Sequence, residues 1–415
     1  MADEYDIVVA GGGMVGISLA LKLGEALPDD TRILLVEGFP LPEQAGADAP
    51  AYHPSFDARS TALSYGSRLI YDSIGVWEDL APGLCPIETI HVSSRGHFGS
   101  AVLAADDYDW PALGYVVENA QMGTALVQAL HRQGRVSLLS PARVTGVELG
   151  EDFAELALQH PEVTSVRTRL VVVADGAESG LRELLGVAVA AKAYEQHALI
   201  TNVATAKSHK GCAFERFTDE GPLALLPLND IDGRHRSALV WTLPPERAEA
   251  LVAADDEVFL EELGQRFGYR LGRMREVGER HTYPLSLVRS EEQVRQGLVV
   301  MGNAAHALHP VAGQGFNLAL RDVASLTEAL ADGLREGKAP GDLAVLRAYQ
   351  KSQQRDQERT IGFSDRVPGL FMQGDPVLGL GRDLALAGLD VMPGLKREFV
   401  RFAAGVADMA VTARG

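Results

Sequence analysis

A glycine-rich turn between a short strand and a helix is the feature that most constrains this fold. Gly11, Gly13 and Gly16 have the spacing GxGxxG. The β-branched run Asp6–Ala10 precedes them, and the helix-forming segment Ile17–Leu27 follows. The first glycine permits the turn, the second lets a pyrophosphate approach the backbone, and the third lets helix and strand pack closely. The pattern predicts a parallel α/β sheet that binds a dinucleotide.

An acidic residue follows at the position that such a site requires. Ile33–Val36 is a second apolar strand, and Glu37 stands at its end. A carboxylate here can accept hydrogen bonds from both ribose hydroxyls of an adenosine and would repel a 2′-phosphate. The alternative is a glycine-rich turn without a ligand. The turn and the acid alone do not distinguish FAD from NAD.

Composition and charge exclude several kinds of protein. The 415 residues contain 38 Lys and Arg against 56 Asp and Glu, so the net charge is −18 and nucleic acid is not an expected partner. Cys85 and Cys212 lie far apart and lack any metal-ligand spacing, so we expect neither a metal site nor a redox dithiol. We find no signal peptide and no apolar run of about 18 residues, so we expect a cytoplasmic protein.

The middle of the chain has a different pattern. Leu170–Ala174 and Leu298–Met301 are strands that lead into polar turns, and we expect both in the first sheet. Between them, residues 198–205, 212–218 and 237–242 alternate, which predicts a second, antiparallel sheet. A helix is expected over Leu63–Ile74.

Further motifs lie outside the glycine-rich turn. They are Arg59-x-x-Ala62-Leu63-Ser64, Asp175-Gly176-x-x-Ser179-x-x-Arg182, and the run from Gly302 through GNAAHALHPVAGQGFNLALRD to Asp322. With the turn, they resemble the flavoprotein aromatic hydroxylases, the family of p-hydroxybenzoate hydroxylase. The segments Asp57–Ser64, Ala213–Thr218 and Tyr283–Leu285, and the pair Gly302-Asn303, are most similar to its ubiquinone-biosynthesis branch. Most of the family has Asp in place of Asn303.

The resemblance implies an α/β fold with a Rossmann-like FAD-binding domain, an inserted antiparallel β-sheet substrate domain and a helical C-terminal region. The expected FAD-binding domain is discontinuous and comprises residues 1–80, 115–186 and 288–340. The substrate domain comprises residues 81–114 and 187–287, and the helical region comprises residues 341–415.

The resemblance also implies an activity. We expect an FAD-dependent monooxygenase that uses NAD(P)H as electron donor and O₂ as co-substrate and forms a flavin C4a-hydroperoxide. The expected reaction of ubiquinone biosynthesis converts 2-polyprenyl-6-methoxyphenol to the 1,4-benzoquinol. A sister hydroxylase acting at another ring position, or a non-catalytic flavoprotein subunit of the biosynthetic complex, remains open.

The resemblance and the residues together suggest the site. The expected cofactor-binding residues are Gly11, Gly13, Gly16, Glu37, Arg59, Gln121, Asp175, Asn303, Gly313, Gln314, Gly315 and Asn317. The segment Gly313–Gly315 lacks bulk and could lie against a flat ring. The helix expected over Phe316–Leu330 would direct its first amides toward the pyrimidine edge of the flavin. The expected catalytic residues are His309, Pro310 and Tyr283.

Several roles stay open at this point. His306 and His309 are either acid/base groups or partners of nearby backbone. Asp175 is either a helix N-cap or a cofactor contact. The resemblance favours a phosphate or nicotinamide-cofactor role for Ser179 and Arg182. Core packing is favoured over a substrate wall for the aromatic residues Phe214, Phe217 and Trp241.

The C-terminal region contains an apolar stripe with basic flanks. Its residues are Leu395, Phe399, Phe402, Val406 and Met409, and Lys396, Arg397 and Arg401 lie beside them. The stripe either packs on the body of the protein or docks to a membrane surface or a partner protein. The second interpretation suits a polyprenylated substrate that resides in lipid. It would place the protein peripherally on the inner face of the membrane.

Overall fold

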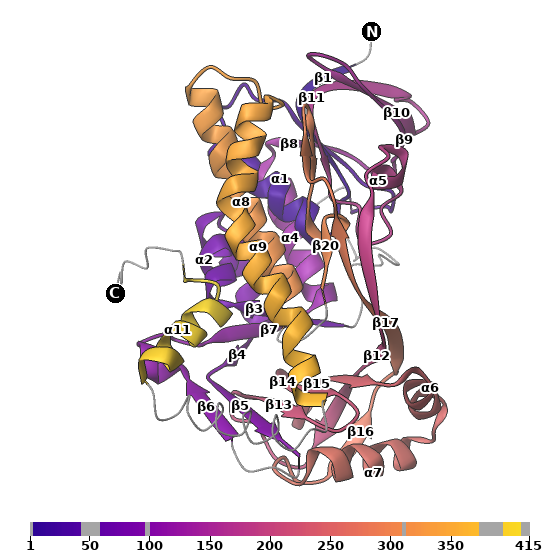
Figure 1. The fold of residues 1–415 in the computed structure, drawn as a ribbon, viewed down its shortest axis with the longest axis vertical. Helices are drawn as coiled ribbons and strands as arrows, with labels where there is room; N and C mark the ends of the chain where they lie inside the picture. The colour runs from indigo at the N-terminus through magenta and orange to yellow at the C-terminus, as the bar shows by residue number, and fades with distance from the viewer. Residues whose placement is uncertain (1–2, 43–58, 96–99, 309–312, 373–392, 408–415) are drawn as a thin grey trace.

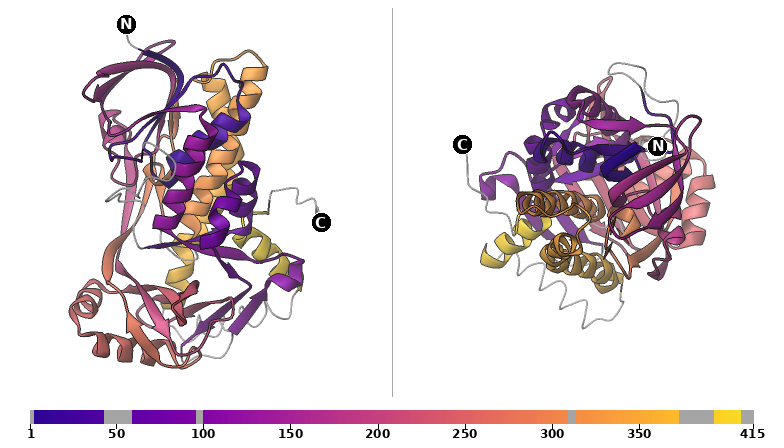
Figure 2. Two further views of the ribbon diagram at one scale, coloured as in Figure 1. Left: turned by 180° about the vertical axis from the view of Figure 1, so that it is seen from behind. Right: turned by 90° about the horizontal axis from the view of Figure 1, so that it is seen from above.

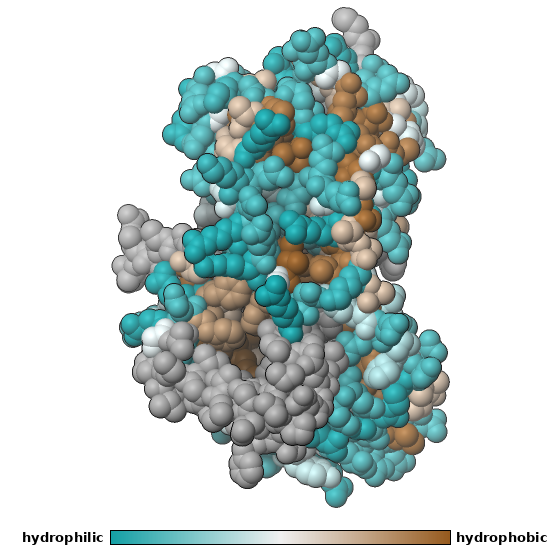
Figure 3. All heavy atoms as spheres, in the orientation of Figure 1, coloured by the Kyte–Doolittle hydropathy of each residue, from teal (hydrophilic) through white to brown (hydrophobic). Residues whose placement is uncertain are grey.

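The computed structural model describes residues 3–42, 59–95, 100–308, 313–372 and 393–407. Figure 1 shows an elongated molecule with one sheet near each end and long helices between them. Polar residues cover most of the described part of the face drawn in Figure 3, in keeping with the high charge of the chain. None of the described helices is long and apolar enough to cross a membrane.

The first sheet has β1 at its centre, paired in parallel with β2 and β11. Its strand order is β18-β19-β11-β1-β2-β8, with β10 added antiparallel to β11 and β9 to β10. The strands are β1 (Asp3–Ala10), β2 (Ile33–Val36), β8 (Val136–Leu139), β9 (Arg143–Leu149), β10 (Ala154–Gln159), β11 (Ser165–Val173), β18 (Val294–Arg295) and β19 (Leu298–Val300). The four strands that the sequence predicted for this sheet are confirmed.

Helices cover one face of this sheet. All of β2 and the carboxyl-terminal halves of β1 and β11 are apolar, because both faces of the sheet are buried there. Three helices share a core with them: α1 (Met14–Ala26), α4 (Asn119–Gln133) and α8 (Gln314–Arg335). Figure 2 shows α9 (Leu343–Met372) alongside α8, and the two helices pack together. The helix α8 begins two residues before the predicted start, because Gly313 takes a left-handed conformation with φ +61° and ends the preceding loop.

A three-stranded antiparallel sheet corrects one prediction. Its order is β3-β7-β4, and its strands are β3 (Ser60–Ser64), β7 (Gly114–Glu118) and β4 (Cys85–Ile87). The helix expected over Leu63–Ile74 is wrong at its start, since it is α2 (Tyr65–Ser73). Ser64 ends the strand and caps the helix by accepting a hydrogen bond from the Ser67 N–H at 3.2 Å.

The second sheet is antiparallel apart from the parallel pair β13 and β5, so that prediction is confirmed. Its order is β20-β17-β12-β15-β14-β13-β5-β6, with β16 beside β12. The strands are β5 (Thr89–Ser94), β6 (Ser100–Ala104), β12 (Val189–Thr205), β13 (Cys212–Phe217), β14 (Pro222–Ile231), β15 (Arg234–Leu243), β16 (Met274–Val277), β17 (His281–Ser290) and β20 (His306–Ala307).

Two helices, α6 (Pro245–Ala253) and α7 (Asp256–Phe267), cover one face of the second sheet. Trp241 is fully buried in the core beneath them, and the ring centroid of Phe214 lies 5.3 Å from that of Phe267 on α7. Both aromatic residues are therefore core, as predicted. The opposite face of this sheet looks toward the first sheet and the three-stranded sheet.

The strand pairing crosses two of the expected domain limits. β4 lies within the range assigned to the substrate domain but pairs with β7 of the three-stranded sheet. β20 lies within the range assigned to the FAD-binding domain but pairs with β17 of the second sheet. The division into three regions otherwise stays a prediction.

The remaining short elements connect these layers. They are α3 (Trp77–Leu80), α5 (Gly180–Leu184), and the 3₁₀ turns Ala81–Gly83, Ala105–Tyr108 and Gly302–Ala304. The C-terminal helix α11 (Pro393–Ala403) packs on the protein itself, since Val400 is buried with Leu103 and Leu113. Of the apolar stripe, Phe399 and Phe402 pack on Phe363 of α9, and Val406 is buried. Met409 lies outside the described residues.

Candidate active site

A cavity of about 850 Å³ lies between the first sheet and the second sheet. At one end its walls are the carboxyl ends of β1 and β2 and the glycine-rich turn. At the other end they are the apolar side chains Ile200, Ala238 and Val240 of the second sheet. A single elongated ligand could therefore reach from the turn to the second sheet.

The N-terminus of α1 forms the first part of this wall. Gly13, Met14 and Val15 line the cavity, and no side chain caps the first turn of the helix. No acidic residue lies in that turn either. The first N–H groups of the helix and the positive end of its dipole are therefore suited to a phosphate group.

Two glycines permit the close approach of turn, strand and helix. Gly11 has φ +114°, and a Cβ atom there would lie 2.4 Å from the carbonyl oxygen of Ala174. A Cβ atom on Gly16 would lie 1.8 Å from the carbonyl oxygen of Gly11. Neither position has room for a side chain, so the structure places these glycines where the GxGxxG pattern requires them.

Glu37 lies in the cavity wall at the end of β2 and is 7% exposed. One of its carboxylate oxygens accepts a hydrogen bond from the Gly12 N–H at 2.5 Å, and the other accepts one from the Phe39 N–H at 2.7 Å. These bonds hold the carboxylate beside the glycine turn. A carboxylate has further lone pairs, so it can still accept a ribose hydroxyl.

Two arginines bring positive charge to the cavity. Arg59 lies in its wall, and its guanidinium is 5.1 Å from the ring centroid of Tyr283. Arg143 lies in the wall beside Glu37, with its guanidinium 5.7 Å from the ring centroid of Phe39. Both cations can pair with the anionic middle of a dinucleotide.

Asp175 bonds to the first turn of α5 without being its N-cap, which is Ser179, and its contact with the cofactor stays a prediction. It lines the cavity, and its carboxylate accepts a hydrogen bond from the Leu181 N–H at 3.2 Å in the first turn of α5. Burial raises the pKa of this carboxyl above its ordinary value, against the opposing effect of its hydrogen bond with Ser179.

Ser179 and Arg182 do not line the cavity. Ser179 caps α5 by accepting a hydrogen bond from the Arg182 N–H at 3.0 Å. The buried Arg182 guanidinium donates to the carbonyl oxygens of Ala304 at 2.9 Å and Ala177 at 3.1 Å. It therefore ties the turn after β11 to the turn after β19, which is a structural role.

Two residues expected to contact the cofactor use their side chains for hydrogen bonds within the protein. The Asn317 side chain donates to the carbonyl oxygens of Ala62 and Gly313 and accepts from Ser64 and Ser67, so its amide is fully used. The Gln314 side chain donates to the carbonyl oxygen of Ala403 at 3.2 Å, near the C-terminal helix. Neither residue lines this cavity, nor do Gly313 and Gly315.

The remaining expected residues are distributed as follows. Asn303 lines the cavity, whereas Gln121 is exposed on α4 and does not line it. His306 is fully buried, and its ring shares a hydrogen bond of 2.7 Å with the carboxylate of Asp322, a side chain rather than the nearby backbone. His309 and Pro310 lie outside the described residues.

Sequence reasoning missed several residues of the wall. They are Phe39, Asn119, Arg143, Ile200, Val240 and Phe316. Apart from Phe316, which lies in the run Gly302–Asp322, none belongs to a recognised motif, because the others come from separate strands, turns and helices. Only Phe316 could have been found, since it follows the glycines at the start of α8.

The residues that line the cavity fit FAD. The uncapped helix N-terminus and the glycine cradle suit the pyrophosphate, and Glu37 suits the adenosine ribose. The apolar side chains of the second sheet suit a flat, weakly polar ring system at the far end of the cavity.

Comparison with known proteins also indicates an FAD-binding protein. The FAD binding domain family matches residues 4–364. A ubiquinone hydroxylase, UbiL, from Rhodospirillum rubrum is 36% identical, over 96% of this chain and 89% of that protein. The 3-demethoxyubiquinol 3-hydroxylase of Escherichia coli is 32% identical, over 97% and 98%.

A solved structure shows the same fold. It is p-nitrophenol 4-monooxygenase PnpA from Pseudomonas putida, with a TM-score of 0.75, 20% identity, and coverage of 97% of this chain and 99% of that one. The family match covers most of the chain, and the identity to the two hydroxylases exceeds 30%. These similarities show membership of the family as well as a shared fold. The chain belongs to the FAD-binding family of ubiquinone-biosynthesis hydroxylases, which are FAD-dependent monooxygenases.

Proposed function

We propose that this protein hydroxylates 2-polyprenyl-6-methoxyphenol to the corresponding 1,4-benzoquinol. The observation that carries the proposal is the continuous cavity between the cradle at Gly11–Gly13 and the apolar face of the second sheet at Val240. It supports a ring substrate bound beside the redox end of FAD. The two relatives are named as hydroxylases of ubiquinone and of a demethoxyubiquinol, which supports a polyprenylated phenol.

Bound FAD supplies the redox chemistry, in which NAD(P)H provides two electrons and O₂ provides the oxygen atom. One oxygen atom enters the ring and the other leaves as water. The first turn of α1, Glu37 and Arg59 line the cavity and would hold the dinucleotide. Ile200, Ala238 and Val240 keep the far end of the cavity apolar, which limits the access of water to the reacting ring.

The test uses the purified, FAD-loaded protein. It is supplied with NADH or NADPH, 2-polyprenyl-6-methoxyphenol and ¹⁸O₂, and the product is analysed by mass spectrometry. We expect one ¹⁸O atom in the benzoquinol. Nicotinamide oxidation without any labelled product would contradict the proposal.

A second candidate is hydroxylation at another ring position. The name of the Escherichia coli relative specifies position 3 of a demethoxyubiquinol, which is a different substrate and ring position from those of the first candidate. The same assay with a demethoxyubiquinol decides between them by the position of the label. A protein that binds FAD but hydroxylates neither substrate would instead support the role of a non-catalytic subunit.

A further inference from the structure

Glu215 is a carboxylate in apolar surroundings near the middle of β13. Its cross-strand neighbours are Val92 on β5 and Ala224 on β14. Ala213 and Phe217, two residues away on the same strand, are buried on the same face. A carboxylate with such neighbours costs free energy when it ionises, unless a partner stabilises it.

The neighbours of Glu215 in the chain show which way it faces. Phe214 packs on Phe267 of α7, and the Arg216 side chain donates to the carbonyl oxygen of Arg266 at 3.1 Å. Both therefore lie on the face covered by helices. Because successive side chains of a strand alternate, Glu215 lies on the opposite face.

That opposite face borders the cavity. Across adjacent strands, Glu215 is opposite Ala224, Ala224 is opposite Val240, and Val240 is opposite Ile200. Val240 and Ile200 line the cavity. Glu215 is two strands from Val240, a distance of about 10 Å. Its side chain is not sealed in the core, since it retains some accessible surface.

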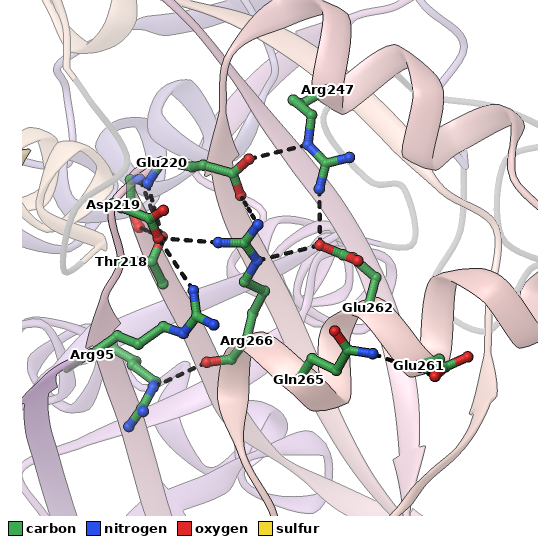
Figure 4. A network of polar contacts seen from close by, with 11 residues as sticks. Arg95, Thr218, Asp219, Glu220, Arg247, Glu261, Glu262, Gln265 and Arg266 are labelled. Carbon is green, nitrogen blue, oxygen red and sulfur yellow. Dashed lines mark hydrogen bonds and ion pairs between the residues drawn. The ribbon is translucent and has the colours of Figure 1, made fainter.

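The cations around the turn that follows β13 are paired with other carboxylates. Figure 4 shows Arg95, Arg247 and Arg266 in one network on the helix side of the sheet. Arg266 pairs with Asp219 at 3.0 Å and with Glu262 at 3.2 Å, and Arg247 pairs with Glu220 at 3.0 Å. This network stabilises the turn after β13 and does not include Glu215.

On the cavity side, the other charged or titratable groups have their own partners or lie on more distant strands. Arg236 on β15 pairs with Glu118 of β7 at 2.7 Å, and Arg59 lies over the Tyr283 ring. His281 is on β17, opposite Ile200. Burial alone raises the pKa of the Glu215 carboxyl to about 7, and no described residue forms a hydrogen bond or ion pair with it.

We propose that Glu215 is a catalytic residue that accepts the phenolic proton of the substrate. This inference rests on the proposed hydroxylation. The phenolic O–H bond breaks, its electron pair stays on the phenolate oxygen, and a new O–H bond forms on Glu215. The phenolate makes the ring richer in electrons and a better acceptor of the oxygen atom. When the product regains its aromatic ring, the C–H bond of the hydroxylated carbon breaks, and its proton leaves in the water formed from the second oxygen atom. The phenolate oxygen takes its proton back from Glu215, which is again ionised.

A binding experiment tests this without turnover. The probe is 2-methoxyphenol, which stays neutral below pH 8 because simple phenols ionise at about pH 10. Calorimetric titration of the wild-type protein should show affinity rising about tenfold between pH 6 and pH 8, as Glu215 ionises and accepts the O–H. The matched probe 1,2-dimethoxybenzene has no O–H, and its affinity should not change. If 2-methoxyphenol binds equally at both pH values, the proposal is wrong.

The variant Glu215→Gln gives the second arm. It retains the size of the side chain but accepts no proton, so binding of 2-methoxyphenol should become independent of pH. The hydroxylation rate at pH 8 should fall about 100-fold. Nicotinamide oxidation should continue without product. The exposed variant Glu261→Gln on α7 is the control and should match the wild type.

The arms separate the two proposals. If the wild type hydroxylates the phenol and Glu215→Gln does so equally well, Glu215 is not the base although the proposed function stands. If the wild type produces no hydroxylated phenol, the proposed function fails, and the pH dependence of 2-methoxyphenol binding still tests Glu215. If the variant does not fold, the pH dependence of 2-methoxyphenol binding to the wild-type protein still tests the role of Glu215.

Discussion

The side-chain amide oxygen of Asn317 accepts a hydrogen bond from the backbone N–H of Ser64 at 2.8 Å, although 253 residues separate them in the chain. The same amide donates to the carbonyl oxygens of Ala62 and Gly313 at 2.8 and 2.7 Å. Asn317 therefore joins the start of α8 to the junction of β3 and α2. It stabilises the region beside the cavity without lining it.

We predict that Asn317→Ala lowers the free energy of unfolding by about 2–4 kcal/mol, because it leaves buried backbone groups without partners. Urea unfolding measures this. Thr124→Ala is the control, since Thr124 is exposed and its hydroxyl bonds only within α4. A change as small as that of the control would show that the amide does not stabilise this junction.

Gly13→Val should yield a folded protein with little FAD. Gly13 lines the cavity at the N-terminus of α1, so a branched side chain there would hinder the approach of the pyrophosphate. We expect a flavin content below roughly a tenth of the wild-type value, measured from the visible spectrum. Gly362→Ala is the control, because a Cβ atom there meets nothing within 4 Å. If the Gly13→Val protein contains as much FAD as the wild type, the pyrophosphate does not bind at Gly13.

Glu37→Gln should weaken FAD binding by about 10–100-fold, since a hydrogen bond to a charged group contributes about 1.5–3 kcal/mol. The amide can replace only one of the two acceptor oxygens that bind Gly12 and Phe39. Fluorescence titration of the flavin-free protein with FAD gives the dissociation constant. An unchanged constant would place the adenosine ribose elsewhere.

The stability of the protein should depend on Glu215 and pH. Its pKa is raised to about 7 in the folded protein, whereas a free glutamate ionises near 4.3. The folded state thus holds a proton that the unfolded state has lost, and stability falls as pH rises between these values. Glu215→Gln does not ionise, so it should be as stable as the wild type near pH 4 and more stable by about 3 kcal/mol at pH 8.

Urea unfolding at both pH values checks this prediction. A variant that is less stable than the wild type at pH 8 would show that the carboxylate stabilises the fold. A variant that is more stable but no longer hydroxylates would show that the protein retains Glu215 for activity at the expense of stability.

Much of the cofactor site was predictable because its signals are local. The spacing of Gly11, Gly13 and Gly16 and the position of Glu37 follow from one strand, one turn and the next strand. Such a unit has the same geometry wherever it occurs, since its strands are parallel and adjacent. The structure places Gly11, Gly13 and Glu37 in the cavity wall and Gly16 against Gly11.

The side-chain partners of Gln314 and Asn317 could not be predicted from the motif. Both stand in the run that resembles the family, yet their side chains bind Ala403 and residues 62–67 of the same chain. Which way a side chain points at the start of a helix depends on what packs there. That packing comes from distant segments, and the spacing of residues does not encode it.

By itself, the sequence determined the glycine cradle, the acidic residue beside it and the alternation that builds the second sheet, because these depend on neighbours in the chain. Only the tertiary structure decided which face of the second sheet borders the cavity. That face is set by the two helices that cover the other side. The physical reason is that alternation sorts side chains into two groups, and only packing decides which group meets the substrate.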